Sequence, residues 1–110
     1  MTVKELMETG RFGVVNEGAH PDAPIGGLFC CDLLSVAMSK APAGAAWVTV
    51  MGNMNTLAVA SLTEVACVIL AEGAALDAQA REKAGEQGIP VLSTEEPIFD
   101  AALWVHTAIQ

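Results

Sequence analysis

The stretch WVTVMGNMNTLAVASLTE, residues Trp47–Glu64, decides the fold of this chain. It opens with an apolar, β-branched run, passes through a small polar group at Gly52–Asn55, and continues as an alanine-rich apolar segment. The first run is typical of a buried strand, and the last segment is typical of a helix. Gly52–Asn55 is therefore either the turn that joins the strand to the helix or a ligand-binding loop at the end of the strand.

The pattern of an apolar strand followed by a helix recurs along the chain. Near-continuous apolar runs stand at residues 45–51, 66–71 and 89–92, and a helical segment follows each of them. Strands of this kind are buried on both faces, as in parallel sheets covered by crossover helices. We expect residues 1–110 to form a single layered α/β domain, with a small, mostly parallel β-sheet flanked by helices.

Ahead of these runs, the sequence predicts a helix, an edge strand and a further short strand. Thr2 and Glu5 have the spacing of a capping box, and the helix that they begin ends before Gly10. Phe12–Val15 is expected to be a short edge strand. The apolar segment GGLFCCD follows a loop rich in Pro and Gly, and Asp32 at its end is expected to cap the next helix.

The three later helices also begin at residues that favour an N-cap. Asn55 is expected to cap the helix that follows the first apolar run, and Asp77 the strongly polar helix after the second. Ser93 and Glu96 have capping-box spacing at the start of the last helix, with Pro97 in its first turn. The apolar stripe of this last helix, which we expect to be buried, consists of Ile98, Ala102, Val105 and Ile109, widened by Phe99 and Leu103.

The composition favours self-association. Hydrophobic residues make up 53% of the 110 residues and charged residues only 16%, against about 45–50% and about 25% in typical soluble domains. A small domain of this kind has too little polar surface to cover itself, and a second copy that buries a shared apolar face is the simplest remedy. We therefore expect a homodimer.

Membrane insertion and nucleic-acid binding are both disfavoured. The uncharged run of residues 41–63 is long enough to cross a bilayer, but the polar group Gly52–Asn55 interrupts it near its middle. The N-terminus lacks the apolar core of a signal peptide, which favours a cytoplasmic protein. The net charge is −8 and the five basic residues are scattered, so no basic stripe is available to a phosphate backbone.

A ligand site is expected, if the chain has one, at the carboxyl ends of the strands. Ligands of open α/β sheets bind there, where the strand order reverses. The loops that leave these ends carry small hydroxyl and amide side chains beside helix N-termini, which can receive an anion. The alternative is that such side chains are only helix caps, and we favour it for Asn55 and Ser93. The candidate ligand-binding residues are Asp32, Ser35, Met51, Gly52, Asn53, Asn55, Ser93 and Thr94.

The sequence contains few residues in the arrangements that known catalytic sites use. The sequence contains neither a P-loop nor a G-x-G-x-x-G motif, no nucleophile in a known catalytic setting, and no cysteine or histidine set at metal-ligand spacing. We therefore expect no metal, no cofactor and no enzymatic activity. Cys30, Cys31 and Cys67 stand in apolar surroundings and are expected to be buried structural thiols. A small thiol-dependent enzyme that uses Cys30, Cys31 or His20 is the remaining catalytic alternative.

Six short segments follow one another in an order that is specific as a set: PIGG, CDLLSVAM, WVTV, AVAS, VILAEG and GIPVLST. In this order they resemble the DRTGG domain family, and the resemblance covers roughly residues 1–106. The chain departs from the family pattern in two places. The name-giving motif is DAPIGG here, at Asp22–Gly27, and Gly52–Met54 fills the place where the family often has a histidine.

This resemblance implies a non-catalytic α/β domain that dimerises and senses a ligand, such as a small molecule or a nucleotide. Such domains look like the N-terminal domain of HPr kinase/phosphorylase, and they also occur between CBS domains of regulatory proteins. HPr kinase activity itself is not implied, because this sequence contains no P-loop. The alternative is a purely structural module that dimerises and docks on a partner enzyme or kinase.

Overall fold

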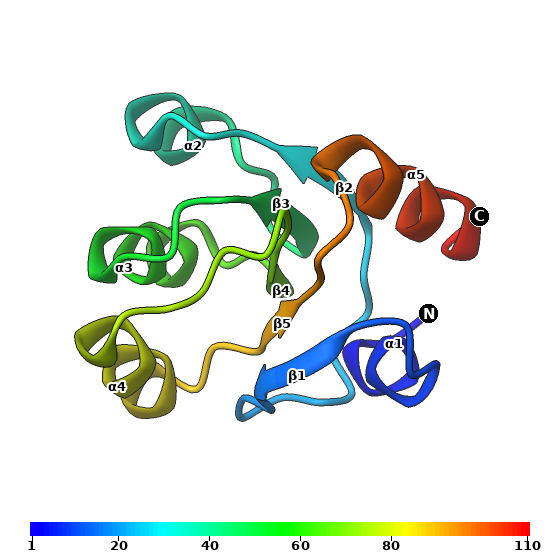
Figure 1. Cartoon of the computed structure of the whole chain (residues 1–110), viewed down its shortest axis with the longest axis horizontal. Coiled ribbons are helices and arrows are strands. Elements are labelled where there is room, and N and C mark those ends of the chain that lie inside the picture. The colour runs from blue at the N-terminus through cyan, green and yellow to red at the C-terminus, as the bar shows by residue number, and fades with distance from the viewer.

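A five-stranded sheet runs through the middle of the molecule, with helices on both of its faces (Figure 1). The computed structural model describes residues 1–110, and its elements are, in chain order, α1 (Val3–Glu8), β1 (Gly13–Asn16), β2 (Gly27–Cys30), α2 (Leu34–Lys40), β3 (Ala45–Thr49), α3 (Met54–Thr63), β4 (Cys67–Leu70), α4 (Ala78–Gln87), β5 (Val91–Ser93) and α5 (Ile98–Ala108). The strand order is β1–β5–β4–β3–β2, with β1 antiparallel to β5 and all other neighbours parallel. The predicted α/β class with a mostly parallel sheet is thus confirmed. No helix has the length and apolar character needed to cross a membrane.

The three crossover helices lie on one face of the sheet, and the two remaining helices lie on the other. Each connection from β2 to β5 steps to the next strand in the same direction, so crossovers of the usual right hand place α2, α3 and α4 side by side. The opposite face is covered by α1 and by α5, which packs on β2 and β3 (Figure 1). Because all three steps run the same way, the order of the parallel strands never reverses. The crevice expected at such a reversal is therefore absent.

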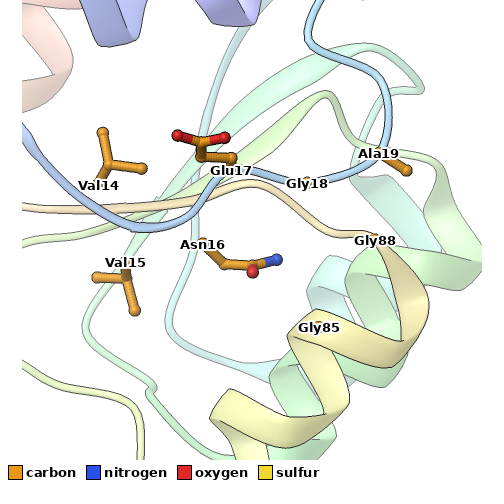
Figure 2. Close-up of a pocket in the computed structure, with 8 residues that line it drawn as sticks. All are labelled: Val14, Val15, Asn16, Glu17, Gly18, Ala19, Gly85 and Gly88. Atoms are coloured by element: carbon orange, nitrogen blue, oxygen red, sulfur yellow. The ribbon is translucent and has the colours of Figure 1, made fainter.

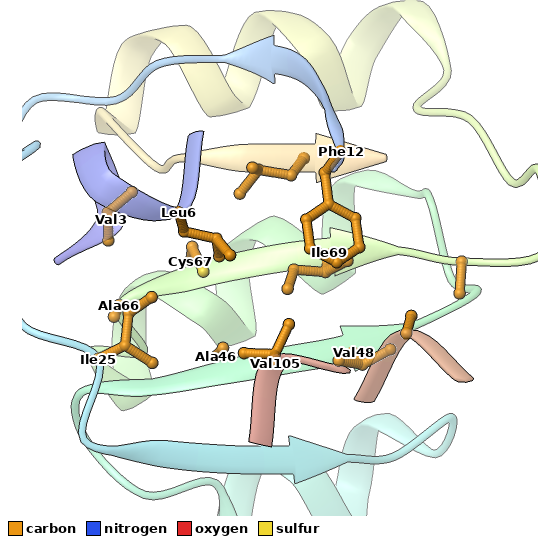
Figure 3. Packing of buried hydrophobic residues seen from close by; sticks show 13 residues of the cluster. Val3, Leu6, Phe12, Ile25, Ala46, Val48, Ala66, Cys67, Ile69 and Val105 are labelled. Carbon is orange, nitrogen blue, oxygen red and sulfur yellow. The ribbon is translucent and has the colours of Figure 1, made fainter. Parts of the chain in front are cut away.

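The central strands β3 and β4 are buried along their whole length, as their continuous apolar runs predict. Alternate residues of β4 belong to two different cores. Cys67 and Ile69 lie in the core beneath α1 and α5, whereas Val68 and Leu70 lie in the core beneath the crossover helices. Figure 3 shows the first of these cores, in which side chains from α1 and α5 meet the strands.

Two of the predicted helix caps are confirmed. The Glu5 N–H donates to the Thr2 hydroxyl oxygen at 3.2 Å, and the Thr2 N–H donates to the Glu5 carboxylate at 2.9 Å. The hydrogen bond that the Glu5 carboxylate accepts from the Thr2 N–H, with a smaller contribution from the Thr2 side chain, lowers the pKa of the Glu5 carboxyl. At the start of α4, the Ala80 N–H donates to the Asp77 carboxylate at 2.8 Å. Both caps join residues within one helical turn.

The predicted cap at Asn55 is wrong. Asn53 caps α3 instead: its side-chain oxygen accepts from the Thr56 N–H at 3.1 Å, and Asn55 lies exposed in the first turn. The chain is held just before this point, because the Asp77 N–H donates to the Gly52 carbonyl oxygen at 3.1 Å. The helix consequently begins two residues earlier than the sequence suggests.

Two further predicted caps are also wrong. Asp32 does not cap α2, since its carboxylate is bonded to the end of β3. Ser93 and Glu96 do not cap the last helix, because Ser93 is the final residue of β5. The N–H of Ile98, at the start of α5, donates to the Glu72 carboxylate at 3.0 Å, so a side chain 26 positions away in the sequence caps this helix.

The buried stripe of α5 is narrower than predicted. Ala101 and Val105 are fully buried, whereas Phe99 and Leu103 are 71% and 50% exposed. A helix that lies on a sheet buries only the side that faces the strands, and α5 packs mainly on β2 and β3. The expected widening of the stripe is therefore absent, and two large apolar side chains face outward.

We predict that Gly52→Ala lowers the free energy of unfolding by about 1–3 kcal/mol. A Cβ atom at residue 52 would collide with the backbone carbonyl oxygen of Ala75, in the neighbouring loop. Gly85→Ala is the control, because residue 85 lies in α4 with open space around it, and alanine there should raise the free energy of unfolding by up to about 1 kcal/mol. Urea denaturation measures both changes, and equal effects in the two variants would contradict the close packing of Gly52.

Candidate functional site

Asp32 is a structural residue at the carboxyl end of β2. Its Oδ1 accepts from the Thr49 hydroxyl at 2.7 Å and from the Val50 N–H at 3.0 Å. These bonds tie the loop after β2 to the end of β3, and they satisfy a threonine side chain that is fully buried. Ser35, the next candidate along the chain, lies exposed in the first turn of α2. The structure therefore does not bring these two candidates into one site.

The loop Met51–Asn55 is a strand-to-helix turn that packs against the loop after β4. The Met51 N–H donates to the Thr49 hydroxyl oxygen at 3.2 Å, Gly52 touches the backbone of Ala75, and the Asn53 side chain caps α3. None of the larger hollows of the surface is lined by residues of this loop. Its polar groups form the hydrogen bonds of the turn and of the helix cap.

The loops after β4 and β5 are hydrogen-bonded to each other. The Glu72 N–H donates to the Glu96 carbonyl oxygen at 2.8 Å, and the Gly73 N–H donates to the Thr94 carbonyl oxygen at 3.0 Å. Glu72 has a left-handed backbone conformation, with φ of 59°, which few residues other than glycine adopt. In this conformation its carboxylate reaches the first N–H of α5.

A pocket of about 330 Å³ opens at the carboxyl end of β5, beside the loop after β4. Ser93 and Thr94 line it, and they are the only predicted site residues that it brings together. Main chain rich in glycine and alanine at residues 73–76 forms one wall, and Arg81 and Glu95 complete the polar lining. At this pocket, the carboxyl edge of the sheet has both a cavity for a ligand and charged side chains, Arg81 and Glu95, to bind it.

Arg81 is the residue of this pocket that the sequence patterns did not indicate. It forms no ion pair, since the one salt bridge of the chain joins Arg11 to Glu96. An unpaired guanidinium that lines the same pocket as hydroxyl groups favours an anionic ligand. The signal that could have revealed it is its place in α4, one turn after Asp77, because helical side chains lean back toward the N-terminus and hence toward the strand ends.

Another hollow, of about 550 Å³, lies along β1 and the end of α4 and has fewer free polar groups for a ligand (Figure 2). Its one amide, Asn16, is already occupied, because Nδ2 donates to the carbonyl oxygens of Ile89 at 2.8 Å and Ala84 at 3.1 Å. Figure 2 shows Asn16 pointing toward the last turn of α4 and Glu17 pointing away from it. Another hollow, about 410 Å³, has His20 among its lining residues.

Of the three cysteines only Cys67 is buried, whereas Cys30 is exposed and Cys31 is half-buried. The prediction of a buried Cys30 is wrong because β2 is an edge strand. Burial raises the pKa of the Cys67 thiol to about 12, and desolvation followed by the nearby Asp32 charge raises the pKa of the Cys30 thiol. Both shifts disfavour the thiolate, which is the reactive form. No group of three or more histidine, cysteine or carboxylate side chains is placed to hold a metal ion.

No protein-family model matches the chain, and no curated protein matches it. The resemblance to DRTGG domains therefore stays a prediction. The α/β topology does not decide the function, because folds of this class serve many functions. The functional proposal consequently depends on the residues that line the pocket.

We predict that Asp32→Ala lowers the free energy of unfolding by about 1–3 kcal/mol, because it removes two charge-assisted hydrogen bonds and leaves the buried Thr49 hydroxyl without its acceptor. Ser35→Ala, at an exposed candidate residue of the same segment, should change this free energy by less than about 0.5 kcal/mol. Urea denaturation of both variants measures the difference. An unchanged free energy of unfolding in Asp32→Ala would show that the fold does not need this carboxylate.

We also predict that the free energy of unfolding falls as the pH rises from 9.0 toward 12, and that it falls less in Cys67→Ala. The thiol has a pKa of about 12 in the folded protein against an ordinary value of 9.0. Below pH 9.0 the thiol is protonated in both the folded and the unfolded chain, so its burial contributes fully to the free energy of unfolding. At higher pH the unfolded chain loses the proton first, so stability falls by up to about 1.4 kcal/mol per pH unit. Denaturant titrations across this range measure the slope, and identical slopes in the two proteins would contradict the prediction.

Proposed function

We propose that this chain is a non-catalytic, cytoplasmic ligand-sensing module that acts as a homodimer, as the resemblance to DRTGG domains implies. Its ligand site is the pocket at the carboxyl end of β5. The observation that carries this proposal is Arg81, a guanidinium without an ion-pair partner in a pocket that also offers the Ser93 hydroxyl. The Thr94 hydroxyl is less available, because its oxygen already accepts from the Glu96 N–H at 3.1 Å.

The lining favours a small ligand with one anionic group. Arg81 can hold a phosphate or carboxylate through two parallel hydrogen bonds, and Ser93 can add a third. Glu95 in the same pocket repels a ligand that is negative throughout, so the ligand also needs a hydrogen-bond donor to face it. At about 330 Å³ the pocket is at the small end of ligand sites, which suits a metabolite or part of a nucleotide.

The cysteines support a non-catalytic role. Reactive cysteines stand in electropositive surroundings that lower the thiol pKa. Cys30 stands in the opposite environment, since desolvation and the Asp32 charge both raise its pKa. Cys67 is fully buried and beyond the reach of a substrate.

A structural module that docks on a partner enzyme is the second candidate, and the exposed apolar side chains favour it. Phe99, Leu62 and Leu103 are 71%, 68% and 50% exposed. Such a module needs no small-molecule ligand, so its thermal unfolding would not respond to one. The role of Arg81 therefore separates the two candidates.

We predict that at least one compound in a panel of nucleotides, sugar phosphates and small carboxylates raises the thermal unfolding midpoint of the wild-type chain, and that Arg81→Gln abolishes the response. A ligand at 100 times its Kd adds about 2.7 kcal/mol to the free energy of unfolding, which a thermal scan detects.

Lys83→Gln is the matched control for this experiment. It removes the same charge from the same helix, but residue 83 does not line the pocket, so the response should persist. A panel that stays silent at millimolar concentration, or an unchanged response in Arg81→Gln, would contradict the proposed site and favour the structural module.

A further inference from the structure

The strand β2 is an edge of the sheet whose outer side is unpaired. β3 is its only neighbour in the strand order, and no hydrogen bond joins residues 27–30 to any other segment. In a parallel strand, alternate residues point both their N–H and their C=O toward one neighbour, and the residues between them point these groups the other way. Half of the backbone donors and acceptors of β2 therefore face outward, without a partner in the chain.

The two edges of the sheet differ in how they are protected against further pairing. The other edge strand, β1, contains a bulge, because its register with β5 shifts between Val14 and Asn16. A bulge twists a strand edge away from a new partner. In contrast, β2 pairs with β3 in continuous register from Gly27 to Cys30, and it contains no proline and no charged residue. The edge that can accept another strand is therefore β2.

The helices on the two faces of β2 expose apolar side chains. α2 crosses from β2 to β3 on one face, and α5 packs on the same two strands on the other. Five of the nine exposed large apolar side chains belong to these helices and the N-cap of α2: Leu33, Val36, Met38, Phe99 and Leu103. Taking about 200 Å² as the surface of a large side chain, their exposed parts amount to about 500 Å². This is most of what a stable dimer buries on each partner, about 800 Å².

We propose that two copies of this chain associate by antiparallel pairing of their β2 strands, so that one sheet continues across both copies. The proposal rests on the homodimer proposed above and names its surface. Two identical strands that run antiparallel supply each other with the missing donors and acceptors, so this edge is complementary to itself. The occupant of the edge is therefore β2 of a second copy.

The alternation of side chains restricts the register of this pair. Leu28 packs against the core beneath α1 and α5, and Phe29 packs against the core beneath the crossover helices. A two-fold axis perpendicular to the sheet keeps each core on its own face, and residues directly opposite in an antiparallel pair have side chains on the same face. The axis must therefore lie level with a residue that faces its own copy, and the middle residues Leu28 and Phe29 are the positions for it.

The distance between the two α5 helices fits this arrangement. Each α5 lies over β2 and β3, and neighbouring strands are about 4.8 Å apart. A helix over the middle of this strand pair lies about 5 Å to one side of the two-fold axis, so α5 and its copy lie about 10 Å apart. Packed helices are separated by about 8–10 Å. Pairing of the strands consequently brings the two helices into contact without a collision.

The flank of α5 that meets its counterpart is the flank beside β2, because a two-fold axis places each flank against the same flank of the other copy. On this flank, Phe99, Leu103 and His106 line a hollow of about 240 Å³ between α5 and β2. Asp100, the only acidic residue of α5, lines a different hollow, which α5 forms with Arg11 on its other flank. The contacting flank therefore carries no carboxylate.

The distribution of charge favours a second copy at this edge. The chain has 13 acidic residues and a net charge of −8, so two copies repel each other over most of their surfaces. Asp100 is the only acidic residue in β2, α2 and α5 together. Asp32 follows β2 at its carboxyl end, and antiparallel pairing keeps the two Asp32 residues about 20 Å apart, because they lie at opposite ends of the strand pair. Two copies can therefore approach here without close contact between like charges.

Sedimentation analysis tests the interface. We expect the wild-type chain to be a dimer at micromolar concentration, and we expect Cys30→Lys to raise the dimer dissociation constant about 100-fold, because the exposed residue 30 of β2 would bury a charge in the strand pair. Val14→Lys is the matched control, since Val14 is 46% exposed on the other edge strand, and the constant should stay unchanged. A monomeric wild-type chain, or an unchanged constant in Cys30→Lys, overturns the proposal.

Hydrogen exchange of the wild-type chain tests the strand pairing without any substitution. The outward-facing amide hydrogens of residues 27–30 should exchange at least about 10-fold more slowly in the dimer than after dilution below the dissociation constant. Those of β1 should exchange at the same rate in both samples. A dimer in which the β2 amides exchange equally fast at both concentrations uses another surface, and this result overturns the proposal.

Two variants of α5 test which flank is in contact. Phe99→Asp should raise the dimer dissociation constant about 10-fold, because Phe99 lies on the flank beside β2. Thr107→Asp, at an exposed residue of the other flank, should leave the constant unchanged. Equal constants in the two variants overturn the arrangement of the helices. Circular dichroism of every variant confirms that the comparison is between folded proteins.

The result is separable from that of the ligand experiment. Arg81 lies in α4, on the opposite face of the sheet from α5 and away from β2 in the strand order (Figure 1). A silent ligand panel would remove the proposed ligand site and leave the interface in place. A monomeric wild-type chain would remove the interface and the homodimer, while a response that depends on Arg81 would preserve the ligand site.

Discussion

The burial of β3 and β4 on both faces is the constraint on which the rest of the structure depends. Every residue of these strands is buried, so both faces of the sheet must be covered by helices. The three crossovers step in one direction and cover one face, which leaves only α1 and α5 for the other. With two helices over that face, α5 keeps a free flank, and Phe99 and Leu103 are exposed there. The exposed apolar side of α5 thus follows from the topology of the sheet.

The same topology explains why the carboxyl edge has so little room. Where neighbouring crossovers lie side by side, the loop after each strand packs against the next: Asp32 bonds to β3, Gly52 touches the loop after β4, and Glu72 bonds to the loop after β5. Space remains at the end of this series, where α4 and β5 meet the short antiparallel β1. The proposed ligand pocket lies there, and Arg81 supplies its positive charge.

One hydrogen-bonded segment links the proposed ligand pocket to α5. The loop after β4 forms a wall of the pocket, and the Glu72 carboxylate in the same loop caps α5. Thr94 lines the pocket and its carbonyl oxygen accepts from the Gly73 N–H, while Glu96 holds Arg11 over the ring of Trp104 in α5. The start of α5 is therefore fixed to the same loop that forms a wall of the pocket.

The sequence by itself determined the fold class, the buried strands, and the caps at Thr2 and Asp77, because each depends on residues within a few positions of one another. Only the tertiary structure decided the other contacts. Asp32 bonds to a residue 17 positions away and Glu72 to one 26 positions away. Arg81 became a pocket residue because α4 lies beside the end of β5. Such partners depend on which strands are neighbours, and strand order is a property of the whole chain that no local pattern specifies.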